Sequence, residues 1–320
     1  MAQKHILVRG TKSGLPYSKG LLARSVQAIG LSPANSWTIA ERLERQLIDS
    51  GREQVTVDEL REAVVELLRT EVGEDASQRY ADWQRAQDRD RPLILLIGGA
   101  TGVGKSTVAT AVAGNLGITR IVSTDAVRDV MRATVSQELL PTLHVSSFET
   151  NEAPVRMKTA ERSETATLLN GYLRQTEAVT VGVEQIIRRA VKEQMDTVVE
   201  GVHVVPGFLR LPSREDAIIV QCVLEVEDYD LHRGNFDARG QHQRRPGHRY
   251  LEHFTQIRMI QAEVVELARS QGVPIVRSYA LDTTVEELTA LVVSTVIEYL
   301  DVDRGDDPSP RLRDVSGSSG

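Results

Sequence analysis

The sequence has little of what marks a secreted, disulfide-bonded or membrane-spanning protein. Cys222 is the only cysteine among 320 residues, which excludes an intrachain disulfide and a zinc site built from cysteines. No apolar run approaches the length of about 18 residues that a membrane-spanning helix needs. The first residues, Met-Ala-Gln-Lys-His, lack the hydrophobic segment of a signal peptide. We therefore expect a cytoplasmic protein in which Cys222 is a buried core residue.

An excess of positive charge is also missing. The chain has 38 lysines and arginines against 45 aspartates and glutamates, a formal net charge of −7. This acidic balance argues against broad binding to nucleic acid or to an anionic membrane surface. The length is sufficient for two domains that each have a core. No internal repeat is present, and the pattern indicates no particular oligomeric state.

The first part of the chain, residues 1–90, predicts a small, mainly helical domain. Thr56 and Glu59 have the spacing of a capping box at the start of one helix. A charged run ending at Pro92 follows this domain and is typical of a linker. The expected elements are a short strand at 5–8 and helices at 19–29, 33–49, 57–71 and 76–87.

The second part, residues 91–300, alternates between apolar strand candidates and helical segments. Such alternation predicts an α/β fold with a doubly wound, mostly parallel sheet. Residues 301–320 are polar and rich in Gly, Ser and Pro, so we expect a disordered tail. The strand candidates are residues 93–97, 120–123, 197–199, 218–224 and 274–277.

Residues 99–106 read Gly-Ala-Thr-Gly-Val-Gly-Lys-Ser, a complete phosphate-loop motif. A predicted strand precedes the motif and an amphipathic helix follows it, which is the context that the motif requires. Backbone N–H groups of such a loop surround a triphosphate, its lysine reaches the β- and γ-phosphates, and its serine coordinates Mg²⁺. We therefore predict binding of a nucleoside triphosphate with Mg²⁺. The expected nucleotide-binding residues are Gly99, Thr101, Gly102, Val103, Gly104, Lys105, Ser106 and Thr107.

Asp125 follows the second strand candidate of the α/β domain. Active sites of open α/β sheets lie beyond the carboxyl ends of the strands, so Asp125 is predicted to face the γ-phosphate. There it could accept the proton of a substrate hydroxyl or hold Mg²⁺ through water. Arg128 and Arg132 are one helical turn apart and suited to an anionic substrate. The alternative is a capping aspartate followed by two solvated arginines.

Glu200 ends the third strand candidate and is predicted to order the water of Mg²⁺, so that Ser106 and Glu200 are the candidate residues of the metal site. His203 follows in a Gly–His loop and is a candidate for contact with the substrate. A loop histidine without a chemical task is the alternative interpretation.

Residues 232–249 contain five arginines and several glycines. This composition predicts a lid that closes over the phosphates, with Arg233 and Arg239 stabilising charge on the transferred phosphoryl group. A solvated basic loop is the alternative.

These features together resemble the 2-phosphoglycerate kinase family, in order and to about residue 300. The resemblance implies a P-loop kinase core that uses ATP and Mg²⁺ to convert 2-phosphoglycerate into 2,3-bisphosphoglycerate. With this reaction, Lys105, Asp125 and Arg128 are the candidate catalytic residues, together with Arg233 and Arg239. The N-terminal part is similar to the ATP-cone, a small helical module that binds nucleotides, often for regulation. The segments that carry the resemblance are residues 16–25, 98–107, 123–128, 200–203 and 249–254.

Two alternatives remain open at the level of the sequence. The kinase could act on another phosphorylated acid, polyol or sugar acid. The protein could also be a regulator that senses nucleotides without catalysis. An intact Lys105, an acceptor-side Asp125 and an arginine-rich lid favour the enzyme, because a sensor needs no acceptor site.

Overall fold

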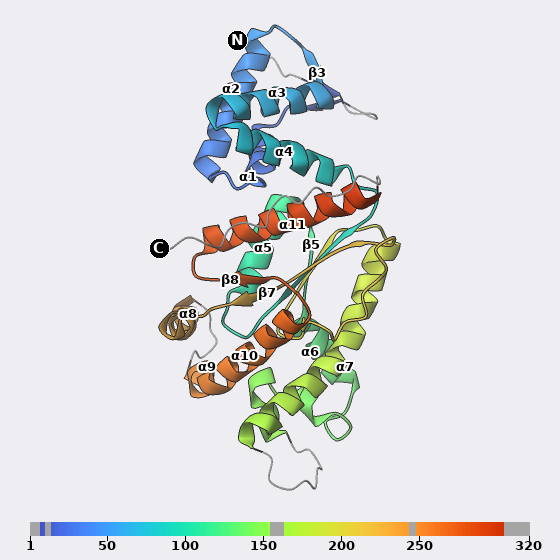
Figure 1. The fold of residues 1–320 in the computed structure, drawn as a ribbon, viewed down its shortest axis with the longest axis vertical. Coiled ribbons are helices and arrows are strands. Elements are labelled where there is room, and N and C mark those ends of the chain that lie inside the picture. Colours follow the sequence, from blue (N-terminus) through green and yellow to red (C-terminus); the bar gives the residue numbers. More distant parts are fainter. Residues whose placement is uncertain (1–6, 10–13, 154–162, 243–247, 304–320) are drawn as a thin grey trace, which may run out of the picture. The chain divides into compact units, whose positions relative to one another are not determined.

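The computed structural model describes residues 7–9, 14–153, 163–242 and 248–303. Two compact units divide the chain (Figure 1). One consists of residues 1–90 together with residues 289–320, and the other of residues 91–288. Within the described residues, no helix is both long and apolar enough to cross a membrane.

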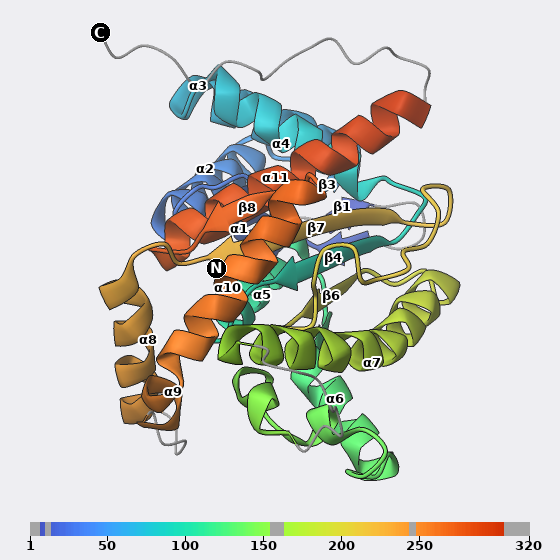
Figure 2. The same cartoon turned by 60° about the horizontal axis from the view of Figure 1, so that its bottom comes forward.

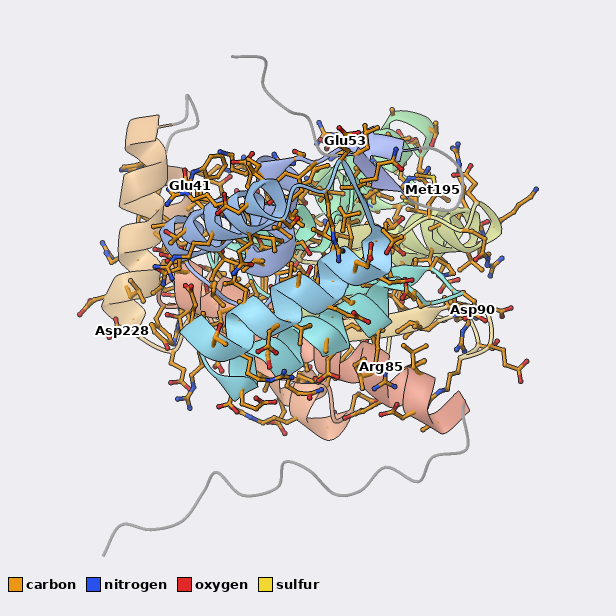
Figure 3. The ribbon with its side chains drawn as sticks, turned by 90° about the horizontal axis from the view of Figure 1, so that it is seen from above. Glu41, Glu53, Arg85, Asp90, Met195 and Asp228 are labelled. Atoms are coloured by element: carbon orange, nitrogen blue, oxygen red, sulfur yellow. The ribbon has the colours of Figure 1, made fainter. Side chains whose placement is uncertain are left out.

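The described part of the N-terminal unit combines a small sheet with four helices from the first 90 residues and with residues 289–303 of the last helix of the chain. Strand β1 (Leu7–Arg9) pairs antiparallel with β2 (Gly14–Pro16) and parallel with β3 (Gln54–Thr56). Helices α3 and α4 run side by side, and Arg85 of α4 forms an ion pair with Asp301 (Figure 3). The helices are α1 (Lys19–Gln27), α2 (Pro33–Asp49), α3 (Val57–Glu71) and α4 (Glu74–Gln87).

The predicted helices of this unit are confirmed, and so is the capping box. Thr56 Oγ1 accepts a hydrogen bond from the Glu59 backbone at 3.1 Å, and Glu59 Oε2 accepts one from the Thr56 backbone at 2.8 Å. Strands β2 and β3 were not expected. Each has three residues, too few to show the alternation that identifies a strand from sequence.

The second unit is built on a five-stranded parallel sheet in the order β5-β6-β4-β7-β8. All five strand candidates are confirmed, with ends that differ by at most one residue. Cys222 on β7 is completely buried, as expected. The strands are β4 (Leu93–Gly98), β5 (Arg120–Ser123), β6 (Thr197–Glu200), β7 (Ile218–Glu225) and β8 (Ile275–Arg277).

Helices cover both faces of this sheet (Figure 2). From β4 the chain crosses towards one edge of the sheet, whereas from β5, β6 and β7 it crosses in the opposite direction. Right-handed connections therefore place the first connecting helix on one face and the later connecting helices on the other. On the face that the later connecting helices cover, Ile94 and Leu96 of β4 belong to one buried cluster with Val183. The helices of this unit begin with α5 (Lys105–Leu116), α6 (Thr124–Thr134), α7 (Glu164–Lys192) and α8 (Tyr229–His242).

The remaining helices are short or lie near the end of the chain. They are the 3₁₀ helices η1 (Pro141–His144) and η2 (Ser147–Glu152), then α9 (His248–Glu252), α10 (Phe254–Ser270) and α11 (Leu281–Asp303). Helix α11 continues into the expected tail as far as Asp303, and the rest of that tail lies outside the described residues.

Candidate active site

The phosphate loop joins β4 to α5 in a conformation that depends on glycine. Gly99, Gly102 and Gly104 have φ angles of +133°, +89° and +86°, a region that other residues rarely adopt. A Cβ atom on Gly99 would also lie 2.5 Å from the carbonyl oxygen of Leu224. Within the part of the chain that the structure describes, no side chain caps the N-terminus of α5. Its first backbone N–H groups are therefore available to an anion.

Lys105 begins α5, and its side chain folds back over the loop. Its exposed fraction is 8%, and Nζ donates a hydrogen bond to the carbonyl oxygen of Ala100 at 2.7 Å. This keeps the ammonium group beside the glycines that are expected to receive the phosphates.

Ser106 and Glu200 meet at the carboxyl ends of β4 and β6. Ser106 Oγ donates a hydrogen bond to Glu200 Oε1 at 2.9 Å, and Glu200 has an exposed fraction of only 5%. β4 and β6 are neighbours whose chains continue towards opposite edges of the sheet. Ligands of open α/β sheets bind where neighbouring strands diverge in this way.

The donors at this position suit Mg²⁺, which prefers oxygen ligands and usually keeps several waters. A hydroxyl and a buried carboxylate provide such oxygens. Among the described residues, no group of three or more His, Cys, Asp and Glu side chains could hold a metal ion by itself. A small number of protein ligands is what a Mg²⁺ ion shared with nucleotide phosphates needs. The residues present therefore fit a Mg²⁺ site, and the roles of Ser106 and Glu200 in it remain a prediction.

Asp125 lies in the first turn of α6, directly beyond β5. The Ser123 hydroxyl accepts a hydrogen bond from the Asp125 backbone at 3.2 Å, which starts the helix and fixes the aspartate at the sheet edge. The Asp125 carboxylate is mostly exposed and lies 3.8 Å from Arg128 Nε. It can therefore meet a substrate from solvent.

The two arginines of α6 differ in their surroundings. Arg128 Nη1 donates to the carbonyl oxygens of Leu143 and Val145 at 3.2 and 2.9 Å, so this arginine holds the η1 segment against α6. Its Nε is buried without a hydrogen-bond partner and faces Asp125. Arg132 is exposed and lies 3.6 Å from Asp129. Arg128 therefore combines a structural contact with an unused donor beside Asp125.

His203 is completely buried, unlike a residue that contacts substrate. Its Nδ1 lies 3.0 Å from Thr124 Oγ1 and its Nε2 lies 3.0 Å from Gln175 Oε1. Burial lowers the His203 pKa to about 4, while Asp125 raises it and Arg128 lowers it. With both ring nitrogens occupied, the neutral imidazole ties α6 to α7. We therefore give His203 a structural role in place of the substrate contact that its loop position suggested.

The first part of the expected lid forms helix α8. In this helix His232 and Phe236 are completely buried and Arg233 is exposed. The residues of this buried face repeat at helical spacing, but the arginines around them give the segment the composition of a basic loop. Arg239 belongs to α8, although its side chain lies outside the described part, as do Arg244 and Arg245 entirely.

Arg249, also expected in the lid, is held by a buried acid. Its guanidinium pairs with both carboxylate oxygens of Glu149 on η2. Burial raises the pKa of Glu149, but the charge and hydrogen bonds of Arg249, together with hydrogen bonds from Ser146, hold this pKa below its usual range. Glu149 was not among the candidates, because a single glutamate in a loop carries no signal before its distant partner is known.

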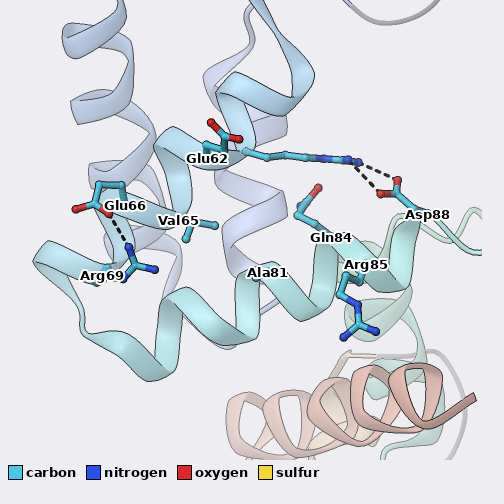
Figure 4. Close-up of a pocket in the computed structure, with 9 residues that line it drawn as sticks. Glu62, Val65, Glu66, Arg69, Ala81, Gln84, Arg85 and Asp88 are labelled. Atoms are coloured by element: carbon cyan, nitrogen blue, oxygen red, sulfur yellow. Dashed lines mark hydrogen bonds and ion pairs between the residues drawn. The ribbon is translucent and has the colours of Figure 1, made fainter. Parts of the chain in front are cut away.

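A shallow pocket lies between α3 and α4 in the N-terminal unit (Figure 4). Three arginines line it, and each is paired with a carboxylate: Arg61 with Asp88, Arg69 with Glu66 and Arg85 with Asp301. Because the positive charge of these arginines is balanced, the pocket offers no evident site for nucleotide phosphates.

Curated relatives match the chain along nearly its whole length, whereas no protein-family model matches it. A 2-phosphoglycerate kinase of Methanopyrus kandleri is 36% identical over 297 residues, which are 92% of this chain and 89% of the relative. A 2-phosphoglycerate kinase of Methanothermobacter thermautotrophicus is 38% identical over 299 residues, or 92% of this chain and 96% of the relative.

Solved structures are matched much more weakly. A gluconokinase from Sinorhizobium meliloti 1021 has 15% identity and a TM-score of 0.39, covering 67% of this chain and 99% of the gluconokinase. A shikimate kinase from Bacteroides thetaiotaomicron has 14% identity and a TM-score of 0.33, covering 62% and 98%. We draw nothing from these weaker likenesses. The sequence identity to the curated relatives, over 92% of the chain, is sufficient to assign the family. This chain belongs to the 2-phosphoglycerate kinase family.

Proposed function

We propose that this protein is an ATP-dependent kinase that phosphorylates 2-phosphoglycerate. The reaction transfers the γ-phosphoryl group of ATP to the free hydroxyl of 2-phosphoglycerate, which gives ADP, 2,3-bisphosphoglycerate and a proton. The observation that carries this proposal is the match to relatives with that name over 92% of the chain. The contact between Ser106 and Glu200, next to Lys105, supports the proposal. Phosphoryl transfer needs a lysine at the phosphates and a metal site beside it.

The ATP side of the site would be formed by the phosphate loop and the first turn of α5. Backbone N–H groups of residues 99–107 would bind the phosphate oxygens, and Lys105 would release its contact with Ala100 to reach the β- and γ-phosphates. Ser106 and Glu200 would hold Mg²⁺, which supplies positive charge against the phosphate oxygens when it is bound.

The acceptor side would be formed by α6. Asp125 would orient the acceptor hydroxyl and accept its proton as the new P–O bond forms. Arg128, whose guanidinium lies beside Asp125, and the exposed Arg132 would hold the phosphate or carboxylate of the acceptor. Arg233 and Arg239 on α8 would stabilise charge on the transferred group. His203 would keep Thr124, and with it the start of α6, in position.

A coupled assay that follows ADP release tests this proposal. The purified protein would be given ATP, Mg²⁺ and one acceptor at a time from a panel: 2-phosphoglycerate, 3-phosphoglycerate, glycerate, and a phosphorylated sugar acid. The proposal expects the highest kcat/KM with 2-phosphoglycerate. Fast turnover with another member of the panel would keep the kinase and replace the acceptor.

A further inference from the structure

Helix α8 holds the phosphate loop through two side chains on one face. His232 Nε2 donates a hydrogen bond to the carbonyl oxygen of Thr101 at 2.9 Å. Asn235 Nδ2 donates one to the carbonyl oxygen of Gly102 at 3.0 Å. Between these contacts, the ring of Phe236 fills the space that a Cβ atom on Gly102 would occupy. The helix and the loop are therefore in direct contact along two consecutive peptide units.

These two contacts determine the orientation of peptide groups that the loop needs. In a planar trans peptide, the carbonyl oxygen and the following N–H point in opposite directions. When His232 holds the Thr101 carbonyl towards α8, the Gly102 N–H points away from α8. When Asn235 holds the Gly102 carbonyl, the Val103 N–H points away in the same manner. Both N–H groups are then fixed as donors on the side of the loop opposite to α8.

The side chains that hold the loop are themselves held firmly. Arg258 Nη1 lies 3.4 Å from His232 Nδ1 and donates to the carbonyl oxygen of Val226 at 2.6 Å. Since Nδ1 faces an arginine donor, it is the acceptor and Nε2 carries the proton. The ring of Phe236 stacks on Tyr250 with centroids 5.3 Å apart, and Phe254 meets His232 edge-on at 5.2 Å. Side chains of α9 and α10 thus hold α8 in position.

Loops rich in glycine have many accessible conformations, and ordering them costs conformational entropy. Gly102 has no side chain that could restrict its own peptide groups, so contacts from other residues have to restrict them. α8 provides it from a distant part of the sequence. A loop that is already oriented loses less free energy on binding a phosphate chain than one that must first be ordered.

We propose that His232 and Asn235 are positioning residues that orient the phosphate loop for ATP. They act through the carbonyl groups of Thr101 and Gly102 and do not touch the nucleotide. This inference rests on the proposed function, since it assumes that the loop binds ATP.

Four variants of the full-length protein test the inference. Asn235→Ala removes one donor without adding charge. His232→Leu removes the other donor but keeps an apolar side chain of similar size in the buried position. His232→Gln is its matched partner, because the amide nitrogen of glutamine can replace Nε2 as a donor. Gly234→Ala is the control on the same helix, since an added Cβ atom there has no described atom within 4 Å.

The readouts are the Kd values for ATP and for inorganic tripolyphosphate, together with the melting temperature. Asn235→Ala and His232→Leu should each raise both Kd values about tenfold, the scale of one lost hydrogen bond. Tripolyphosphate should respond as ATP does, because it has only the phosphate chain. His232→Gln should stay within about threefold of wild type, and Gly234→Ala should bind as wild type does.

Three outcomes separate the possibilities. Wild-type affinity in both Asn235→Ala and His232→Leu would overturn the inference, even when their melting temperatures fall, and would leave the proposed function standing. Equal losses in His232→Leu and His232→Gln would assign the effect to packing and overturn the role of His232. A wild-type protein that binds neither ATP nor tripolyphosphate would instead overturn the proposed function.

Discussion

Ser106 and Glu200 are 94 residues apart in the sequence, yet the Ser106 hydroxyl donates a hydrogen bond to the Glu200 carboxylate at 2.9 Å. The contact joins the helix after the phosphate loop to the end of the neighbouring strand β6. It places a neutral and an anionic oxygen together at the sheet edge, where α/β proteins bind their ligands. A metal bound there would be shared between this pair and the nucleotide.

The first prediction concerns the charge of Glu200. Glu200→Gln keeps an oxygen that accepts the Ser106 hydrogen bond but removes the negative charge. The Mg²⁺ concentration for half-maximal activity should rise about 10- to 100-fold, the range for weakened metal sites. Glu193→Gln is the control, since Glu193 pairs with Arg120 and Arg189 at the end of α7. Superimposable Mg²⁺ titrations of Glu200→Gln and wild type would remove Glu200 from the metal site.

The second prediction concerns Lys105. Lys105→Ala should abolish phosphoryl transfer, because the charge that develops on the phosphoryl group loses its main partner. The melting temperature should change little, since the ammonium group bonds to a single loop carbonyl. Steady-state turnover and thermal unfolding measure the two effects separately. Turnover within tenfold of wild type would contradict the assigned role.

The third prediction separates the two roles that the sequence leaves open for Asp125. Asp125→Asn keeps the size of the side chain and removes its basicity. A general base predicts a fall in kcat of roughly 10²-fold or more with little change in the affinity for Mg²⁺·ATP. Loss of Mg²⁺·ATP affinity with kcat preserved would make Asp125 a residue of the metal site.

The fourth prediction compares the two arginines of α6. Both Arg128→Ala and Arg132→Ala should raise the KM for 2-phosphoglycerate more than the KM for ATP, since each removes a charge-assisted hydrogen bond worth about 1.5–3 kcal/mol. Only Arg128→Ala should also lower the melting temperature, because Arg128 holds the carbonyls of Leu143 and Val145. Equal changes in both KM values would place the arginines away from the acceptor.

The fifth prediction uses the buried His203. Its pKa in the folded protein is about 4, whereas an unfolded histidine has an ordinary pKa of 6.5. The unfolded state therefore binds a proton more readily, so stability is full above about pH 6.5 and is lost as the pH falls towards 4. The loss is on the order of 3 kcal/mol.

Urea unfolding between pH 4 and pH 7 measures this dependence. His203→Gln removes the titrating ring and should flatten the curve, whatever its stability at neutral pH. An equally steep curve in His203→Gln would show that other groups produce the pH dependence.

The sequence predicted the parallel sheet well because each buried strand is a continuous apolar run with clear ends. Leu93–Gly98 is completely buried along its whole length, which is the pattern of a central parallel strand. The proximity of Ser106 to Glu200 also followed from the sequence, since Ser106 ends the phosphate-loop motif that follows β4 and Glu200 ends β6, and the carboxyl ends of these parallel strands share one edge.

Contacts between distant segments could not be predicted in the same way. His203 had the position of a substrate ligand, and only its contacts with Thr124 and Gln175 show that both ring nitrogens are used. The signal for α8 was present but weak: Tyr229, His232 and Phe236 repeat at helical spacing beneath a sequence dominated by arginine and glycine.

The central claim is that this protein transfers a phosphoryl group from ATP to 2-phosphoglycerate. The most direct test incubates the wild-type protein with Mg²⁺, 2-phosphoglycerate and ATP that carries a labelled γ-phosphate, with Lys105→Ala as the control, and separates the products. The account predicts label in 2,3-bisphosphoglycerate in an amount equal to the ADP formed, and none with Lys105→Ala. ADP formation that is independent of 2-phosphoglycerate, with the label released as inorganic phosphate, would contradict it.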